Sequence, residues 1–290
     1  MVGLFQTHHF FIKRRIVGMV DKSLMINLGE SYYKSQIERL VSDLFFKDKQ
    51  LILLSGPSGS GKTTTARLII ESIKEKGKKA VYLSMDDWFK TKSEYEVPKT
   101  EDGKPDFESP ICVDIDLLNE DLIALLNGYR VELPKYDFVA QKMYYDGTSM
   151  QIDNNTIIVI EGLHALNSFI TVDRSKCYRV FVKPNDILYD GTPFTNEDIR
   201  LYRRISRDKL HRGRTIEDTL EMLSSVSRGE KLYLFPTVKD IDFNVDTFIS
   251  YELYLHKTIL GDFQKLKDIH NIEITIKDIP KGSLLEEFYF

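Results

Sequence analysis

The clearest chemistry in the sequence lies in a glycine-rich run near position 60. The run is Gly56-Pro57-Ser58-Gly59-Ser60-Gly61-Lys62-Thr63, which matches Gly-x-x-x-x-Gly-Lys-[Ser/Thr] without a mismatch. Its glycines let several backbone N–H groups point at one anion, and a helix behind them adds partial positive charge. Lys62 is placed to reach the β- and γ-phosphates, and the Thr63 hydroxyl to bind Mg²⁺. The residues predicted to bind the nucleotide are Gly56, Ser58, Gly59, Ser60, Gly61, Lys62, Thr63 and Thr64.

This turn predicts a nucleotide but does not by itself predict a reaction. A GTPase would need the guanine-reading pattern Asn-Lys-x-Asp, and the chain has no Asn-Lys dipeptide and no Asp-x-x-Gly. The remaining classes are an ATP-driven motor or switch and a small-molecule kinase.

Acidic residues follow two predicted strands. Asp86 and Asp87 lie at the carboxyl end of strand 80–84, the edge where open α/β sheets bind ligands. Asp86 can accept a proton from a substrate hydroxyl that attacks the γ-phosphate; Asp87 competes for this role, and turn capping is the structural alternative. Glu161 follows strand 156–160 and can hold Mg²⁺ directly or through water, or it is simply a solvated strand end.

Arginines gather on one predicted helical face. The spacing i, i+3, i+4, i+7 is that of Arg200, Arg203, Arg204 and Arg207, and two more arginines, Arg212 and Arg214, flank Gly213. Guanidinium groups this close repel one another without anions, and an ATP triphosphate would supply them. The alternative is a solvated basic helix that pairs with neighbouring Glu or Asp side chains.

Short apolar strands alternating with helices would position these residues. Strands buried on both faces are predicted at 51–54, 80–84, 156–160 and 178–182, with a further strand at 271–276. Helices are predicted at 31–48, 63–76, 114–127, 196–212, 215–228 and 251–267. Residues 91–110 form a long polar loop, and 131–137 and 142–152 are strand-and-turn segments. The alternation predicts a layered α/β fold with a mainly parallel sheet.

Composition narrows the class of protein. The chain has 290 residues, of which 42% are hydrophobic and 29% charged, so it is neither disordered nor fibrous. A net charge of −4 argues against a broad nucleic-acid or membrane surface. Cys112 and Cys177 fit no metal spacing and no disulfide framework, which predicts core packing in a reducing cytoplasm. No apolar run reaches the roughly 20 residues of a membrane span.

The N-terminus carries no recognisable signal. Residues 1–30 show no strong period, and the apolar stretch 4–12 precedes the basic run 13–15, the reverse of a signal peptide. The helix at 31–48 is amphipathic, so it is expected to pack on the core of the protein or on a second subunit of a homo-oligomer.

Together these motifs resemble the uridine kinase and phosphoribulokinase family of P-loop kinases, from about Leu51 to Asp246. The marks of the resemblance are segments 56–63, 83–87, 107–110, 133–138, 158–162 and 203–214. Segments 160–167 and 283–288 look like the bacterial nucleoside-kinase branch. The resemblance implies a P-loop NTPase three-layer fold with a helical lid. It also implies ATP- and Mg²⁺-dependent phosphorylation of the 5′-hydroxyl of a ribonucleoside, with uridine or cytidine the first choice.

The family resemblance also implies roles for individual residues. Asp86 corresponds to the catalytic base and, with Thr63 and Glu161, to the metal site; Lys62 and Arg207 are the other implied catalytic residues. Glu108 falls where uridine kinases place an Asp on the ribose hydroxyls, and Gln141 where animal-type enzymes have a His on the pyrimidine. An amide can donate and accept, so Gln141 could read a pyrimidine or another base edge. The implied substrate-binding residues are Asp86, Phe107, Glu108, Tyr136, Phe138, Gln141 and Arg204, and the implied phosphate-binding arginines are Arg204, Arg207, Arg212 and Arg214.

The sequence predicts two segments of the chain and leaves three alternative functions open. Residues 1–48 are an N-terminal extension, and 49–290 are the kinase domain, with a lid helix at about 196–214 and a C-terminal helix and tail at about 250–290. The rivals are a kinase for another hydroxyl compound such as a sugar phosphate or pantothenate, a nucleotide-binding regulator without catalysis, and an RNA-associated factor using the arginine helix. The overall acidity disfavours the last of these.

Overall fold

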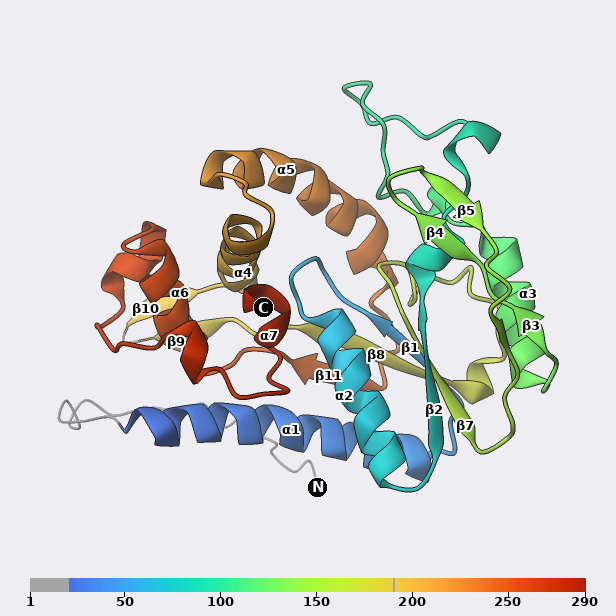
Figure 1. The fold of residues 1–290 in the computed structure, drawn as a ribbon, viewed down its shortest axis with the longest axis horizontal. Helices are drawn as coiled ribbons and strands as arrows, with labels where there is room; N and C mark the ends of the chain where they lie inside the picture. The colour runs from blue at the N-terminus through green and yellow to red at the C-terminus, as the bar shows by residue number, and fades with distance from the viewer. Residues whose placement is uncertain (1–20, 190) are drawn as a thin grey trace, which may run out of the picture.

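A five-stranded parallel sheet forms the centre of the protein. The computed structural model describes residues 21–189 and 191–290, so the 4–15 pattern lies outside the described residues. The sheet order is β11-β8-β1-β7-β2 (Figure 1). Its strands are β1 (Leu51–Ser55), β2 (Lys79–Ser84), β7 (Thr156–Glu161), β8 (Cys177–Lys183) and β11 (Phe243–Asp246). Every pairing among them is parallel, which confirms the predicted sheet.

Two hydrophobic cores cover the two faces of this sheet. Ile52 and Leu54 enter one core with helices α1 (Lys22–Phe46) and α2 (Lys62–Glu75). The alternate residues of the strand, Leu51 and Leu53, enter the other core with helix α3 (Ile115–Leu126). Because successive side chains of a strand point to opposite faces, both sets are buried, and the strand has no polar face. The three-layer α/β architecture is therefore confirmed.

Helix α1 is longer than predicted. It begins at Lys22, where the Asp21 carboxylate accepts hydrogen bonds from the first-turn backbone, so the predicted start at residue 31 is wrong. Leu24 and Leu28 in its first turns are exposed, so the apolar residues there do not mark one buried face. The helix packs on α2 and β11, and the Tyr33 hydroxyl lies 2.7 Å from Thr65 Oγ1. The predicted packing of this helix on the core of the protein is confirmed.

The second half of the chain supplies a helical layer above the phosphate-binding turn. Helices α4 (Asn196–His211) and α5 (Ile216–Gly229) each begin with a capping box, Thr195 with Asp198 and Thr215 with Asp218. They are followed by α6 (Glu252–Leu260) and the short α7 (Glu286–Tyr289). In Figure 1 the C-terminal end lies between α4 and α2.

Two predicted elements near the C-terminus differ from the structure. Helix α6 ends at Leu260 because Gly261 follows with φ +67°, outside the helical region, so the predicted helix at 251–267 is too long. Residues 264–268 form a separate 3₁₀ turn, and the predicted strand at 271–276 is absent. Its apolar residues Ile274 and Ile272 instead pack, as irregular chain, against the core that α1 shares.

Short antiparallel pairs complete the fold. They are β3 (Val131–Glu132) with β6 (Ser149–Met150), β4 (Lys135–Asp137) with β5 (Lys142–Tyr144), and β9 (Ile187–Tyr189) with β10 (Thr192–Phe194). Neither the last pair nor β11 was predicted. The predicted loop at 91–110 holds the 3₁₀ turn Lys92–Glu94, an isolated bridge between Lys99 and Pro105, and the start of another 3₁₀ turn at Pro110–Cys112. Across the described part of the chain, no helix has the length and apolar character needed to cross a membrane.

Candidate active site

The glycine-rich turn joins β1 to α2 at the carboxyl edge of the sheet. Gly59 and Gly61 have φ values of +76° and +86°, which side chains with a Cβ rarely adopt. Gly56 has a different constraint, since a Cβ there would lie 2.1 Å from the Val182 carbonyl oxygen on the neighbouring strand. Glycine is thus required at three positions for two separate physical reasons.

The N–H and ammonium donors of this turn form hydrogen bonds with oxygen atoms of the protein. Lys62 Nζ donates to the Gly56 carbonyl at 2.9 Å, and the Ser58 N–H donates to Glu230 Oε1 at 2.8 Å. At the other end of the turn, the Thr64 N–H donates to Glu287 Oε2 at 3.2 Å. These are the groups that phosphate oxygens would use. Sequence reasoning missed both glutamates, because they come from positions more than 150 residues away.

The predicted metal residues lie together at the sheet edge. Glu161 pairs in register with Leu54 of β1 and Ser84 of β2, so its side chain reaches the start of α2. Its Oε1 accepts hydrogen bonds from Thr63 Oγ1 at 3.1 Å and from the Tyr82 hydroxyl at 2.9 Å. Tyr82 is a further residue of this cluster that the sequence reasoning missed.

The chemistry of this donor set fits Mg²⁺. The ion prefers hard oxygen ligands and usually keeps several waters while binding one or two carboxylates and the substrate phosphates. Thr63, Asp86 and Glu161 offer one hydroxyl and two carboxylates. Between residues 21 and 290, leaving out position 190, no group of three or more His, Cys, Asp or Glu could hold a metal alone. A site completed by nucleotide phosphates and water is consistent with this.

The two adjacent aspartates differ in their surroundings. Asp87 forms an ion pair with Lys135 at 2.9 Å. Burial by surrounding protein atoms raises the pKa of Asp86 to about 6, and the nearby Glu161 carboxylate adds to the rise while Lys62 opposes it. Although protein atoms crowd its carboxyl group, Asp86 is exposed to solvent. A carboxyl group with a raised pKa, open to a substrate and beside the phosphate turn, is suited to accept a proton.

The arginine face divides into two pairs with different partners. Arg203 is fully buried and pairs with Glu252 at 2.7 Å, and Arg200 pairs with Glu230 at 2.8 Å. For these two arginines the expectation that ATP supplies the anions is wrong, because glutamates from later in the chain supply them, as the alternative of Glu or Asp pairing had it. Both guanidinium groups also donate to carbonyls of the turn, Arg200 to Ser58 and Arg203 to Gly59. Arg204 and Arg207 point to a different environment, where burial lowers the pKa of each guanidinium and Arg212 adds like charge.

Asp208 lies close to three of the remaining arginines. Its buried carboxylate lies 3.1 Å from Arg212, 3.6 Å from Arg214 and 3.8 Å from Arg207 Nε. Arg207 Nε has no hydrogen-bond partner among the residues that the structure describes. One carboxylate among three guanidinium groups leaves positive charge and an unsatisfied donor, which suits a phosphate ligand. Asp208 is a residue of this arginine cluster that sequence reasoning missed.

The predicted ribose residue faces the nucleotide turn. Burial raises the pKa of the Glu108 carboxyl, with Glu230 adding to the rise and Arg204 and Lys62 opposing it. Its side chain packs on Gly229, where an added Cβ would lie 2.5 Å from Glu108 Cβ. The loop is anchored by the buried Asp106, which accepts from Arg228 at 2.8 Å and Tyr233 at 2.7 Å. Helix α5 and the long loop are thereby joined.

An aromatic cluster adjoins the Asp86–Asp87 turn. The Tyr136 and Phe138 rings lie 5.0 Å apart, and Phe89 lies 5.5 Å from Tyr136. Phe138 is 62% exposed, so a face of the cluster is open to a ligand. Gln141 adopts φ +53°, and its carbonyl accepts from the Lys92 N–H. Phe107 is also exposed, with Lys92 Nζ 5.6 Å from its ring centre.

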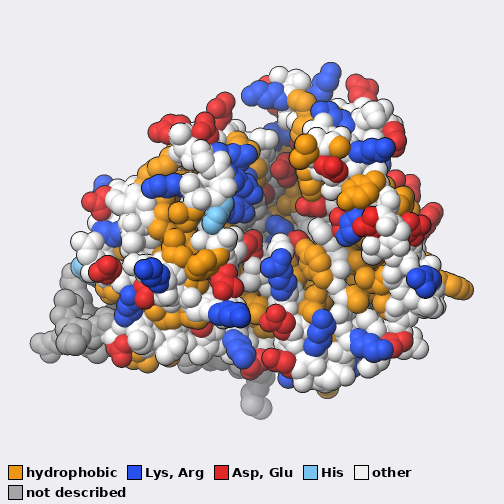
Figure 2. Space-filling view, in the orientation of Figure 1, with side chains coloured by type: hydrophobic (Ala, Val, Ile, Leu, Met, Phe, Trp, Pro, Cys, Tyr) orange, Lys and Arg blue, Asp and Glu red, His pale blue; other side chains and the backbone are white. Residues whose placement is uncertain are grey.

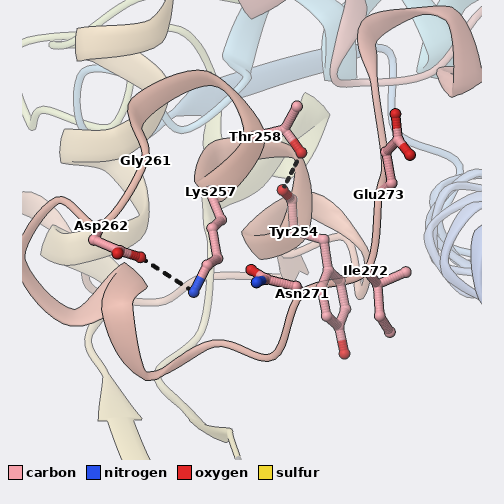
Figure 3. A pocket seen from close by; sticks show the side chains of 8 residues that line it. All are labelled: Tyr254, Lys257, Thr258, Gly261, Asp262, Asn271, Ile272 and Glu273. Atoms are coloured by element: carbon pink, nitrogen blue, oxygen red, sulfur yellow. Dashed lines mark hydrogen bonds and ion pairs between the residues drawn. The ribbon is translucent and has the colours of Figure 1, made fainter.

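These parts surround a hollow in the molecular surface. Figure 2 shows it between the side formed by α4 and α5 and the side formed by β4 and β5, with basic side chains on the α4 wall and acidic ones opposite. A separate cavity of about 420 Å³ lies at the C-terminal end of α6 (Figure 3). It is lined by residues from 254 to 273, including Lys257 and Asp262, and contains none of the predicted site residues.

The fold and this site define a P-loop kinase. The chain belongs to the Phosphoribulokinase / Uridine kinase family, whose sequence model matches residues 51–252. A uridine kinase of Halobacterium salinarum is 28% identical over 190 residues, which are 65% of this chain and 76% of that protein. A uridine kinase of Borrelia garinii subsp. bavariensis is 31% identical over 194 residues, 67% of this chain and 84% of that protein.

Two further likenesses differ in extent. Mouse uridine-cytidine kinase-like 1 is 32% identical over 197 residues, which are 68% of this chain and 33% of that protein. The solved structure of a kinase assigned to a fructose transport system of Silicibacter sp. TM1040 has a TM-score of 0.53 at 17% identity. It covers 72% of this chain and 98% of that chain, a likeness of fold. The family membership makes the protein an ATP-dependent kinase.

Proposed function

We propose that this kinase transfers the γ-phosphate of ATP to the 5′-hydroxyl of a ribonucleoside, with uridine or cytidine as the preferred substrate and Mg²⁺ as the metal. The observation that carries the proposal is the position of Asp86. It is within electrostatic range of Lys62 and Glu161, and the 3₁₀ turn Met85–Trp88 that carries it packs on β4, the strand that holds Tyr136. A candidate base is thus near the phosphate-binding lysine, and the turn that holds it adjoins an aromatic cluster with a partly exposed ring.

The chain's own residues would perform the reaction mainly by positioning. Asp86 accepts the proton of the attacking hydroxyl, and Glu108 orients the ribose by accepting hydrogen bonds from its other hydroxyls. Lys62, Arg204 and Arg207 hold the phosphate oxygens and oppose the charge that develops on them. Little covalent chemistry is required of a protein that catalyses phosphoryl transfer.

Thr63, Asp86 and Glu161 would hold the metal ion. Mg²⁺ bound there would neutralise phosphate charge. The Tyr82 hydroxyl fixes one oxygen of Glu161, so the carboxylate is oriented before any ligand arrives. The Asp106 contacts join the long loop to α5, so both can close together over the ligands and exclude water.

A panel of acceptors tests the substrate. Purified protein is incubated with ATP, Mg²⁺ and separate nucleosides, sugars, sugar phosphates and pantothenate, and the product mass is recorded. We expect a mass gain of one phosphate on uridine or cytidine at the 5′ position. Phosphorylation of a sugar or pantothenate alone would replace the nucleoside assignment with the alternative kinase.

Asp86→Asn tests the assigned base. The substitution keeps the size of the side chain but removes its ability to accept a proton, so turnover should fall by at least about 10²-fold. ATP binding without Mg²⁺ should be retained because Asp86 is not part of the turn. The matched control is Asp87→Asn, which removes the neighbouring carboxylate that pairs with Lys135 and should retain turnover. Equal losses in both variants would contradict the assignment.

The remaining expectations belong to the same proposal. The phosphorylated nucleoside fits a role in nucleoside salvage in the cytoplasm, with a small molecule and no nucleic acid as the partner. We divide the chain into an extension, 1–48, and a kinase domain, 49–290. Since α1 shares a hydrophobic core with α2, we expect the described part of the extension to be required for stability.

A further inference from the structure

The C-terminal tail contacts the phosphate-binding turn directly. Helix α7 lies between α4 and α2 (Figure 1), and Glu287 reaches the first turn of α2. Glu287 Oε2 accepts two hydrogen bonds from one residue, from the Thr64 N–H at 3.2 Å and from Thr64 Oγ1 at 2.7 Å. A carboxylate from the end of the chain therefore occupies a backbone donor at the N-terminus of α2.

Buried side chains on both sides of Glu287 hold the tail in this position. Leu284 lies against the glycine before α2, where a Cβ on Gly61 would be 2.6 Å from Leu284 Cδ1. Phe288 is fully buried, with the Arg203 guanidinium 5.1 Å from its ring centre. The Tyr289 hydroxyl lies 2.8 Å from His256 Nδ1. Glu287 thus projects from a fixed segment.

The groups around Glu287 are those that a phosphate would use. The first N–H groups of a helix have no partner within the helix and carry partial positive charge, so they bind anions. Thr64 is the third residue of α2, and its N–H is one of these groups. Arg203 and Arg207 are also within electrostatic range of the Glu287 carboxylate. The carboxylate and a nucleotide phosphate would compete for the same N–H.

Glu230, which bonds the other end of the turn, is held by an ion pair that Glu287 lacks in the described part of the chain. Its Oε1 accepts from the Ser58 N–H and also from Arg200 at 2.8 Å, with the side chain buried. Displacing it would leave a buried arginine without its anion, which is costly. Glu287 has no comparable ion pair among the described residues, so it is the carboxylate that can leave.

We propose that Glu287 is a further residue of the nucleotide site, which sets the affinity for ATP by holding the Thr64 N–H until a phosphate displaces it. Binding of ATP then displaces the Glu287 carboxylate from Thr64, which removes two hydrogen bonds that hold the tail against α2 and so loosens the tail. The inference rests on ATP binding at the glycine-rich turn and is independent of which hydroxyl compound is phosphorylated.

The first test compares ATP dissociation constants by calorimetric titration with MgATP. Glu287→Gln keeps the shape of the side chain but replaces a charge-assisted hydrogen bond to Thr64 with a neutral one, which is weaker by about 1.4 kcal/mol. We expect it to bind ATP about tenfold more tightly than the unsubstituted chain. The matched control, Glu286→Gln, removes the same charge one residue earlier and should change the constant less than about twofold. Unchanged or weaker binding by Glu287→Gln, or an equal gain in both variants, would overturn the proposal.

The second test uses the unsubstituted chain, so it does not depend on a variant folding. Backbone N–H groups of the tail are held by short-range hydrogen bonds, such as Phe290 N–H to the Glu286 carbonyl and Phe288 N–H to the Leu285 carbonyl. MgATP should therefore accelerate hydrogen exchange in the peptide covering 283–290. Unchanged or slower exchange on saturation with MgATP would contradict the displacement. If the unsubstituted chain did not bind ATP at all, the proposed nucleotide site itself would be refuted. If the unsubstituted chain and Glu287→Gln bound ATP equally, only the role of Glu287 would be refuted.

Discussion

Arg203 allows a sharp test of which arginines serve stability and which serve the ligand. Its Nε and Nη2 donate to the two Glu252 oxygens at 2.7 and 2.9 Å, and both side chains have no exposed surface. Nη1 donates to the Gly59 carbonyl at 3.2 Å, and Thr247 accepts two more bonds. Burial is the largest single influence on the pKa of Glu252 and would raise it, but the Arg203 charge together with hydrogen bonds from His256 and Arg203 lowers the pKa overall.

The expected cost of breaking this pair follows from its burial. Arg203→Leu leaves the Glu252 carboxylate buried without its counter-charge, which costs about 3–5 kcal/mol in free energy of unfolding. The double variant Arg203→Leu/Glu252→Leu removes both charges and should recover most of this loss. About 1–2 kcal/mol should remain, because the Gly59 and Thr247 carbonyls lose a donor. The two substitutions should therefore be strongly non-additive.

Urea unfolding measures this prediction. Trp88, the single tryptophan, is 1% exposed, so its fluorescence reports the loss of the core together with circular dichroism. Lys79→Met is the control, since Lys79 and Asp153 pair at the surface with side chains 68% and 52% exposed and should contribute less than about 1 kcal/mol. A loss below about 1 kcal/mol in Arg203→Leu, or additive single effects, would refute the reasoning.

Two further predictions concern the metal and pH. Glu161→Gln should raise the Mg²⁺ concentration for half-maximal turnover by at least about tenfold, while ATP binding without Mg²⁺ stays unchanged; a shift in ATP binding alone would point to a different role. His164 is 5% exposed, and burial lowers its pKa to about 4, below the usual value of about 6.5. As the pH falls, the unfolded chain therefore protonates this imidazole before the folded chain does. The free energy of unfolding should fall by up to about 3 kcal/mol between about pH 6.5 and 4. The variant His164→Gln should flatten that part of the unfolding-against-pH curve, and an unchanged slope would contradict the prediction.

The local sequence pattern predicts best those elements in which every residue is buried. Strands β1 and β7 consist almost entirely of apolar residues buried on both faces, and the predicted segments match them to within one residue. Helix α1 shows the limit, because its first turns expose Leu24 and Leu28 and so lack an apolar period. Strand β11 has only Val245 fully buried, and it pairs solely with β8, so its four residues carry no local signal.

The candidate site divides in the same way. The amino-acid sequence by itself determined the phosphate-binding turn, because left-handed glycines, a lysine and a hydroxyl at fixed spacing are a local requirement. It also determined Asp86 and Glu161, because the carboxyl ends of parallel strands meet at one edge. Only the tertiary structure decided which arginines remain for a ligand. Glu252, Glu230 and Asp208 are the anions that make this division, and two of them come from later segments of the chain. Burial and charge pairing depend on which segments meet in space, and no local spacing encodes that.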